Sequence, residues 1–74
     1  MLGIRYYRLS RGWSQNRLAR QVGIRQASIC RIEQGRLKPA DELLGRIAAA
    51  LGVYPAFKLL RPVEVEDQDR QVSG

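Results

Sequence analysis

Apolar residues recur at intervals of three and four along the first sixty positions of the chain, and glycines interrupt them. This spacing places apolar side chains on one face of an α-helix, and a glycine often follows the last helical residue. The pattern predicts four helices, at about 2–11, 15–21, 26–33 and 40 or 41–51, and a short fifth that begins at Pro55 and ends at Leu60. The expected fold class is therefore all-α, with five short helices in a single compact domain.

The end of the chain has a different composition, polar and acidic, with no helical periodicity. Val63 and Val65 alternate with Glu64 and Glu66, so a short strand is the alternative to a flexible segment. We expect a folded domain at 1–61 and a flexible acidic tail at 62–74.

The balance of charge points to an anionic partner. Lys and Arg number 13 against 7 Asp and Glu, and the net charge is +6. Residues 1–62 carry twelve basic and three acidic side chains (+9), whereas residues 63–74 carry one basic and four acidic (−3). So basic a fold repels itself unless an anion neutralises it, and nucleic acid is the commonest such partner. A membrane surface is the rival, but no apolar run is long enough to span a bilayer or to act as a signal peptide.

The residues that enzymes and metal sites need are scarce. The chain has no histidine, and its one cysteine, Cys30, cannot form an internal disulfide. A lone cysteine fits a reducing compartment, so we expect a cytoplasmic protein with no metal and no cofactor. Without a histidine base, Cys30 is interpreted as a small half-buried residue and not as a nucleophile. The sequence does not indicate an enzyme.

The most informative stretch runs from Gln15 to Glu33. Ala19 is small enough to let two short helices cross closely, and Gly23 tolerates the positive φ that a tight turn between them favours. Ile29 and Ile32 lie one turn apart and anchor the second helix to the core. The opposite face of that helix is therefore expected to point outward.

Six strings follow one another between residues 4 and 60, in a fixed order and almost without gaps. They are Arg8-Leu-Ser-Arg-Gly12-Trp-Ser14-Gln15, Leu18-Ala19, Val22-Gly23-Ile24, Ser28-Ile29-Cys-Arg-Ile32-Glu33-Gln-Gly35, Lys38-Pro39 and Ile47-Ala48-Ala-Ala-Leu51-Gly52-Val53. Together they resemble the Cro/CI-type (xenobiotic-response-element, XRE) helix-turn-helix domains of phage repressors and bacterial regulators. The resemblance implies a lambda-repressor-like fold that binds double-stranded DNA in a sequence-specific way, as a transcriptional regulator and dimeric repressor.

The resemblance also implies which side chains read the DNA. Gln26, Ala27 and Arg31 stand where family members place base-contacting residues. Glutamine suits adenine, alanine can touch only a thymine methyl, and arginine suits guanine. Gln15 resembles the residue that opens the second helix, contacts a phosphate and braces the recognition helix.

Two further pairs of residues match family positions. Arg8 and Glu33 correspond to residues that form an ion pair, which would tie the first helix to the end of the third. Arg36 and Lys38 would lie over the DNA backbone and set the register without reading sequence.

Three positions depart from the family pattern. Family members usually carry an acidic residue where Arg17 stands, which would complete a capping box with Ser14. They often carry Ser or Thr where Arg25 stands, and usually an apolar residue where Asp41 stands, so the start of the fourth helix is expected to shift. A cation near a helix N-terminus opposes the macrodipole by roughly 0.3–1 kcal/mol. We therefore hypothesise that Arg17 and Arg25 are phosphate contacts that lower the stability of the free protein.

A homodimer is expected because one module buries little surface, and two modules could read half-sites about 34–36 Å apart. The apolar residues left over place the dimer contact at Phe57, Leu59 and Leu60, with Val63 and Val65 as extensions. The aromatic side chains Trp13, Tyr7 and Phe57 are interpreted as core or dimer contacts and not as platforms for bases.

Other functions fit the same pattern. An antitoxin would repress its own operon and bind a protein toxin through the acidic tail, and small controller proteins of restriction–modification systems are also lone domains of this size. A protein-interaction module that has lost DNA binding is the alternative from another class. Such a module would not need Gln15, Gln26, Arg31, Arg36 and Lys38 on one face. RNA is a weaker candidate because the A-form major groove is too narrow for the third helix.

Overall fold

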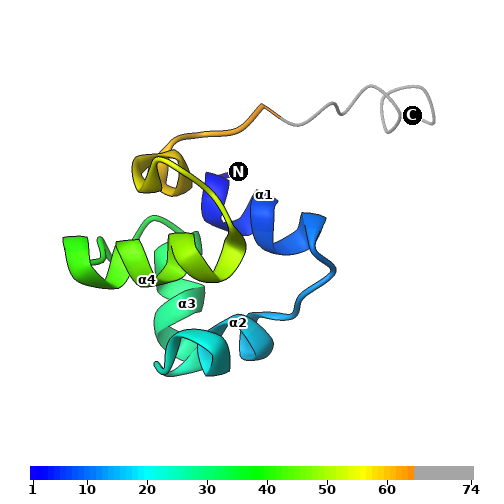
Figure 1. The fold of residues 1–74 in the computed structure, drawn as a ribbon, viewed down its shortest axis with the longest axis vertical. Helices are drawn as coiled ribbons and strands as arrows, with labels where there is room; N and C mark the ends of the chain where they lie inside the picture. The colour runs from blue at the N-terminus through cyan, green and yellow to red at the C-terminus, as the bar shows by residue number, and fades with distance from the viewer. Residues whose placement is uncertain (65–74) are drawn as a thin grey trace.

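The computed structural model describes residues 1–64, which form four α-helices and one 3-10 helix. These are α1 (Gly3–Ser10), α2 (Gln15–Val22), α3 (Gln26–Glu33), α4 (Asp41–Leu51) and η1 (Ala56–Leu60). Figure 1 shows α2 and α3 side by side at one end of the molecule, α1 and η1 at the other, and α4 between them. The predicted all-α fold class is confirmed.

No helix among the described residues is long and apolar enough to cross a membrane.

The turn between α2 and α3 is built as the sequence predicts. Gly23 ends α2 in the left-handed region at φ 86°, and its N–H donates to the carbonyl of Ala19 at 2.8 Å. At the start of α2, the Ser14 hydroxyl accepts a hydrogen bond from the backbone N–H of Arg17 at 3.0 Å. Half of a capping box is therefore present although its acidic partner is missing. At the start of α4, Asp41 is the first helical residue, and Ala40 provides no side-chain cap.

The fifth element differs from the expectation of an α-helix that begins at Pro55. Pro55 lies outside the element with an extended ψ of 160°, and the 3-10 helix begins at Ala56. A single turn makes too few hydrogen bonds to support an α-helix, and short 3-10 pieces are common in this situation. A Cβ at Gly3 would overlap the carbonyl oxygen of Lys58, so η1 packs directly on the backbone of α1.

The N-terminus pairs with the segment that follows η1. Gly3 N–H donates to the Arg61 carbonyl at 2.8 Å, and Val63 N–H donates to the Met1 carbonyl at 2.7 Å. Leu2 and Pro62 form an isolated antiparallel bridge, so backbone pairing extends past the expected domain boundary at 61. The sequence offered a short strand over residues 63–66 as an alternative to a flexible segment. Within residues 1–64 the structure has only this bridge, and Val65 lies outside the described residues.

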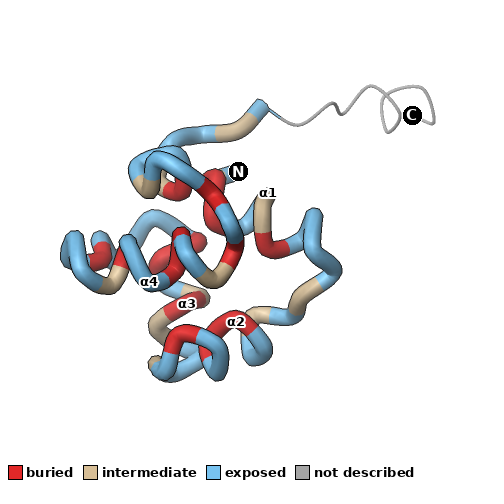
Figure 2. The backbone as a smooth tube through the Cα atoms, in the orientation of Figure 1, coloured by how far each residue is buried: buried red, intermediate tan, exposed pale blue. Residues whose placement is uncertain are grey.

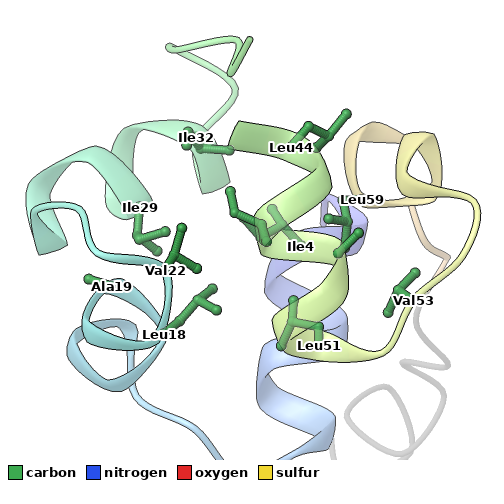
Figure 3. Packing of buried hydrophobic residues seen from close by; sticks show 12 residues of the cluster. Ile4, Leu18, Ala19, Val22, Ile29, Ile32, Leu44, Leu51, Val53 and Leu59 are labelled. Atoms are coloured by element: carbon green, nitrogen blue, oxygen red, sulfur yellow. The ribbon is translucent and has the colours of Figure 1, made fainter. Parts of the chain in front are cut away.

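Twelve buried apolar side chains from all five elements form one core (Figure 3). Ile4 of α1, Leu18 of α2, Ile29 of α3 and Ile47 of α4 are each fully buried. Figure 2 shows the buried positions turned toward the interior, with exposed positions along the outside of each helix. Leu59 is also 0% exposed. Its expected place in a dimer contact is therefore wrong, because its side chain belongs to the core of its own protomer.

A buried ion pair joins the first helix to the third. Arg8 Nε donates to Glu33 Oε2 at 2.6 Å, and Arg8 Nη2 donates to Glu33 Oε1 at 3.0 Å. Both residues are buried. Arg8 Nη1 donates to the carbonyl of Trp13 at 2.7 Å, and no buried side-chain N or O atom in residues 1–64 lacks a partner. Each nitrogen of the Arg8 guanidinium and each oxygen of the Glu33 carboxylate thus has a hydrogen-bond partner, which is the condition under which a buried pair is tolerated.

Removing one member of this pair is expected to destabilise the domain strongly. Glu33→Ala leaves the Arg8 charge buried without a partner, and we expect the free energy of unfolding in urea to fall by about 3–5 kcal/mol. The double variant Arg8→Met/Glu33→Leu removes both charges. It should lose less stability than the sum of the losses in Arg8→Met and in Glu33→Leu. Strictly additive losses would contradict the description of the two side chains as one unit.

Candidate nucleic-acid interface

The outer face of α3 carries the residues expected to read bases. Ile29 and Ile32 are fully buried on the inner face, while Gln26, Ala27 and Arg31 are all exposed. The helical spacing of these three positions places them on the solvent side of a single helix. The structure therefore brings the three sequence-predicted residues together on one surface.

Two residues near the C-terminal end of α3, Cys30 and Gln34, are not among the predicted contacts. Cys30 is half-buried, and exposed Gln34 donates from Nε2 to its sulfur at 3.3 Å. Gln34 follows Cys30 by four positions, which continues the outer row of α3 by one turn. This spacing was visible in the sequence, but Gln34 follows the last helical residue, where side-chain direction is hard to predict.

A chain of side-chain hydrogen bonds runs from the buried ion pair to the surface of α3. Gln15 Nε2 donates to Glu33 Oε1 at 2.9 Å, and Gln26 Nε2 donates to Gln15 Oε1 at 2.7 Å. Glu33 is a pure acceptor, so it requires the amide nitrogen of Gln15 to face inward and the carbonyl to face Gln26. The orientation of the Gln26 amide is thereby determined from the interior.

Within residues 1–64, one side-chain N–H of Gln26 and its side-chain carbonyl oxygen have no partner. Its other N–H is used by Gln15, and the side chain itself is exposed. A neighbouring donor and acceptor in one plane is the arrangement that pairs with the N7 and N6 positions of adenine. The structure thus presents a preformed polar group that is complementary to a base edge.

The half of the chain that forms α1, α2 and α3 is almost purely cationic. Residues 1–32 contain seven arginines and no Asp or Glu. The first carboxylate is Glu33, and its charge is taken up by Arg8 in the one ion pair among the described residues. The other six arginines are exposed, namely Arg5, Arg11, Arg17, Arg20, Arg25 and Arg31. Such a surface has a positive potential that attracts anions.

Basic side chains lie at both ends of α3. Arg25 precedes the helix as its N-cap residue and makes no capping hydrogen bond with its side chain. Arg36 and Lys38 are exposed in the loop after the helix. The Arg36 N–H donates to the carbonyl of Arg31 at 2.9 Å, which holds this loop against the end of α3. The residues expected to contact the DNA backbone therefore flank the exposed face of α3.

Trp13 and Tyr7 are half-buried, and both pack against the core cluster as expected. Trp13 also lies beside two guanidinium groups. No three His, Cys, Asp or Glu side chains among residues 1–64 come together as a metal site.

Residues 4–58 match a family model described as helix-turn-helix. A hypothetical transcription factor from Neisseria meningitidis serogroup B is 41% identical over 59 residues, which are 80% of this chain and 55% of that protein. An uncharacterized HTH-type transcriptional regulator from Methanothermobacter thermautotrophicus is 43% identical over 49 residues, which are 66% of this chain and 71% of that protein.

The fold agrees with a solved structure. The crystal structure of the hypothetical transcription factor NHTF from Neisseria superposes with a TM-score of 0.72 at 36% identity, covering 97% of this chain and 77% of that one. The chain spans 55% of the length of the Neisseria meningitidis relative. The helix-turn-helix family is not a family of enzymes, in agreement with the sequence. From the matched residues, the relatives and the shared fold, this chain belongs to the Cro/CI-type (XRE) family of helix-turn-helix proteins.

Proposed function

We propose that this chain is a sequence-specific regulator of transcription that binds double-stranded DNA as a homodimer and represses the bound promoter. The observation that supports this most is the hydrogen-bonded chain from Glu33 through Gln15 to Gln26. A buried charge holds an exposed amide in one orientation, and an amide held in this way loses little side-chain entropy when it binds a base. A surface without a ligand to read would gain nothing from this arrangement.

In this proposal α3 enters the major groove and three side chains read the base pairs. Gln26 offers its free donor and acceptor to adenine, and Arg31 offers its planar fork to guanine. Ala27 lies between them and leaves room for a thymine methyl group. The exposure of all three side chains on one face supports this assignment.

The backbone contacts come from residues around the reading face. Gln15 retains one N–H after its bond to Glu33, and this donor is available to a phosphate. Arg17 and Arg25 belong to the starts of α2 and α3, and Arg36 and Lys38 follow the end of α3. These charges would fix the register and supply most of the sequence-independent affinity.

The dimer contact is proposed at η1 and the adjoining surface. Phe57 is 52% exposed and Tyr54 is 67% exposed, whereas Leu60 is half-buried and lines an apolar hollow of about 400 Å³. Exposed Leu37 lines the same hollow. Exposed apolar side chains favour association, and a second copy supplies the second recognition helix that a palindrome requires.

Repression needs no contact beyond DNA binding, because a bound dimer excludes polymerase from the same site. The antitoxin alternative depends on the acidic tail, most of which lies outside the described residues. The alternative of an interaction module leaves the preorganised Gln26 amide without a use.

The primary test is selection of binding sites from a random pool of duplex DNA. We expect a palindromic sequence that binds at least about a thousandfold more tightly than scrambled DNA. A steep dependence of affinity on salt with no preferred sequence would contradict specific readout and leave phosphate binding alone. Absence of binding to any duplex would favour the interaction module.

Variants of the two classes of contact should behave differently on the selected site. Gln26→Ala and Arg31→Ala are each expected to lose about 1–3 kcal/mol on that site and little on scrambled DNA. Lys38→Ala should weaken binding to the selected site and to scrambled DNA equally. It should also reduce the slope of log affinity against log salt by about 1. If the Gln26 and Arg31 variants lose affinity equally on both DNAs, these residues do not read bases. Filter-binding titrations at several salt concentrations provide the measurement.

The dimer contact is tested with Phe57→Ser. Truncating a central aromatic contact typically costs about 2 kcal/mol or more, so the dimer should dissociate at a roughly thirtyfold higher concentration in sedimentation equilibrium. Leu9→Ser is the matched control, because Leu9 is also about half exposed, at 47%, and lies at the opposite end of α1 from Gly3, whose backbone meets η1. A native protein that is monomeric at high micromolar concentration would overturn the dimer.

A further inference from the structure

Trp13 is fixed in place by the same arginine that forms the buried ion pair. Its N–H donates to the Arg8 carbonyl at 3.1 Å, and its own carbonyl accepts from Arg8 Nη1 at 2.7 Å. The residue lies in the connection between α1 and α2 and is half-buried. Both backbone polar groups are thus bonded to one neighbour, which fixes the backbone of this residue, and the half-buried indole ring packs against the core cluster.

Two guanidinium groups lie over this ring. The Arg17 Cζ is 4.8 Å from the ring centroid and the Arg11 Cζ is 5.6 Å from it, both within the range of a cation–π contact. Arg11 also donates from Nε to the Leu51 carbonyl at 3.0 Å, so it is committed to α4. Within residues 1–64, Arg17 has no ion-pair partner and its side chain makes no hydrogen bond, and it is exposed. Its five N–H donors therefore remain available to a ligand.

The first turn of α2 adjoins the face that we propose reads DNA. Gln15 is two residues before Arg17. The side-chain Oε1 of Gln15 accepts a hydrogen bond from Nε2 of Gln26, at the start of α3, at 2.7 Å. Gln15, in the same turn, is itself a proposed phosphate contact, so the proposed complex would place the DNA backbone near this turn. Every charged side chain in residues 1–32 is an arginine, and the carboxylate that reaches Gln15, Glu33, is paired with Arg8. A phosphate at this point would therefore meet a net positive charge.

We propose that Trp13 is a positioning residue, whose indole ring holds the Arg17 guanidinium in place to bind a phosphate of the DNA backbone. The inference rests on the proposed DNA binding and adds to it a contact outside the recognition helix. A flexible arginine loses rotamer freedom when it binds, and stacking on a fixed ring removes part of that loss beforehand. The ring also offsets part of the destabilisation expected from a cation in the first turn of α2.

The test is a double-mutant cycle on DNA binding with the full chain and its selected duplex. Trp13→Leu keeps apolar bulk but removes the π-system, and we expect it to weaken binding about three- to fivefold when Arg17 is present. In the Arg17→Ala background the same change should have no effect. Trp13→Phe keeps a ring and should retain most of the affinity. Trp13→Met, which also lacks a ring, replaces the leucine variant if that variant fails to fold.

The salt dependence identifies the ligand as a phosphate. Arg17→Ala should lower the slope of log affinity against log salt by about 1, and Arg17→Lys should restore it. Arg20→Ala is the matched control. Arg20 is exposed on the same helix, one turn further on, and its substitution removes the same charge. We expect this control to leave the slope unchanged.

Trp13 also provides a direct signal, since it is the only tryptophan in the chain. DNA binding at Arg17 should change its emission, and the change should shrink in Arg17→Ala. Additive losses in the cycle, or an unchanged salt slope in Arg17→Ala, would overturn the proposed role of Trp13. Neither result would contradict DNA binding by the native chain or base contact by Gln26. Failure of the native chain to bind any duplex would instead overturn the proposed function together with this inference.

Discussion

The ion pair between Arg8 and Glu33 is the interaction on which the rest of the structure depends. Two charges in a small core are costly unless they are paired and hydrogen-bonded, and no buried side-chain N or O atom in residues 1–64 lacks a partner. Arg8 holds Trp13, and Glu33 holds Gln15. Because the pair joins α1 to α3, it also fixes the two helices that have few other contacts with each other. A hydrophobic pair of the same volume could stabilise the fold, but it could not orient polar side chains at the surface.

Polar contacts connect the buried ion pair to side chains at the surface and fix their orientation. The apolar core positions the helices, since buried isoleucines and leucines from every element meet in one cluster. The hydrogen bonds that leave Glu33 then set the direction of the Gln26 amide. The uncompensated arginines around it repel one another in the free protein. In the proposed complex, phosphates lying against them would relieve that repulsion, so the same charges that weaken the free domain would strengthen DNA binding.

Much of the fold could be predicted from the sequence, and the errors have identifiable causes. The bounds of α3 and α4 and the Gly23 turn agree with the structure, because apolar spacing and glycine act over a few residues. The segment after Pro55 has the same apolar character but forms a 3-10 turn, since its hydrogen bonds depend on packing against α1. Leu59 was assigned to a dimer for lack of any other use, whereas the structure buries it in the core.

For the candidate site, the sequence by itself determined the residue types and their order. Gln26, Ala27 and Arg31 share a helix face because 3.6 residues complete a turn, and this is a local property. The sequence could not show that the Gln15 amide faces Glu33 with its nitrogen and Gln26 with its oxygen, or that Arg17 lies on Trp13. These contacts join side chains whose separation depends on how α1, α2 and α3 cross. Such crossing is decided by the packing of the whole core, which only the tertiary structure contains.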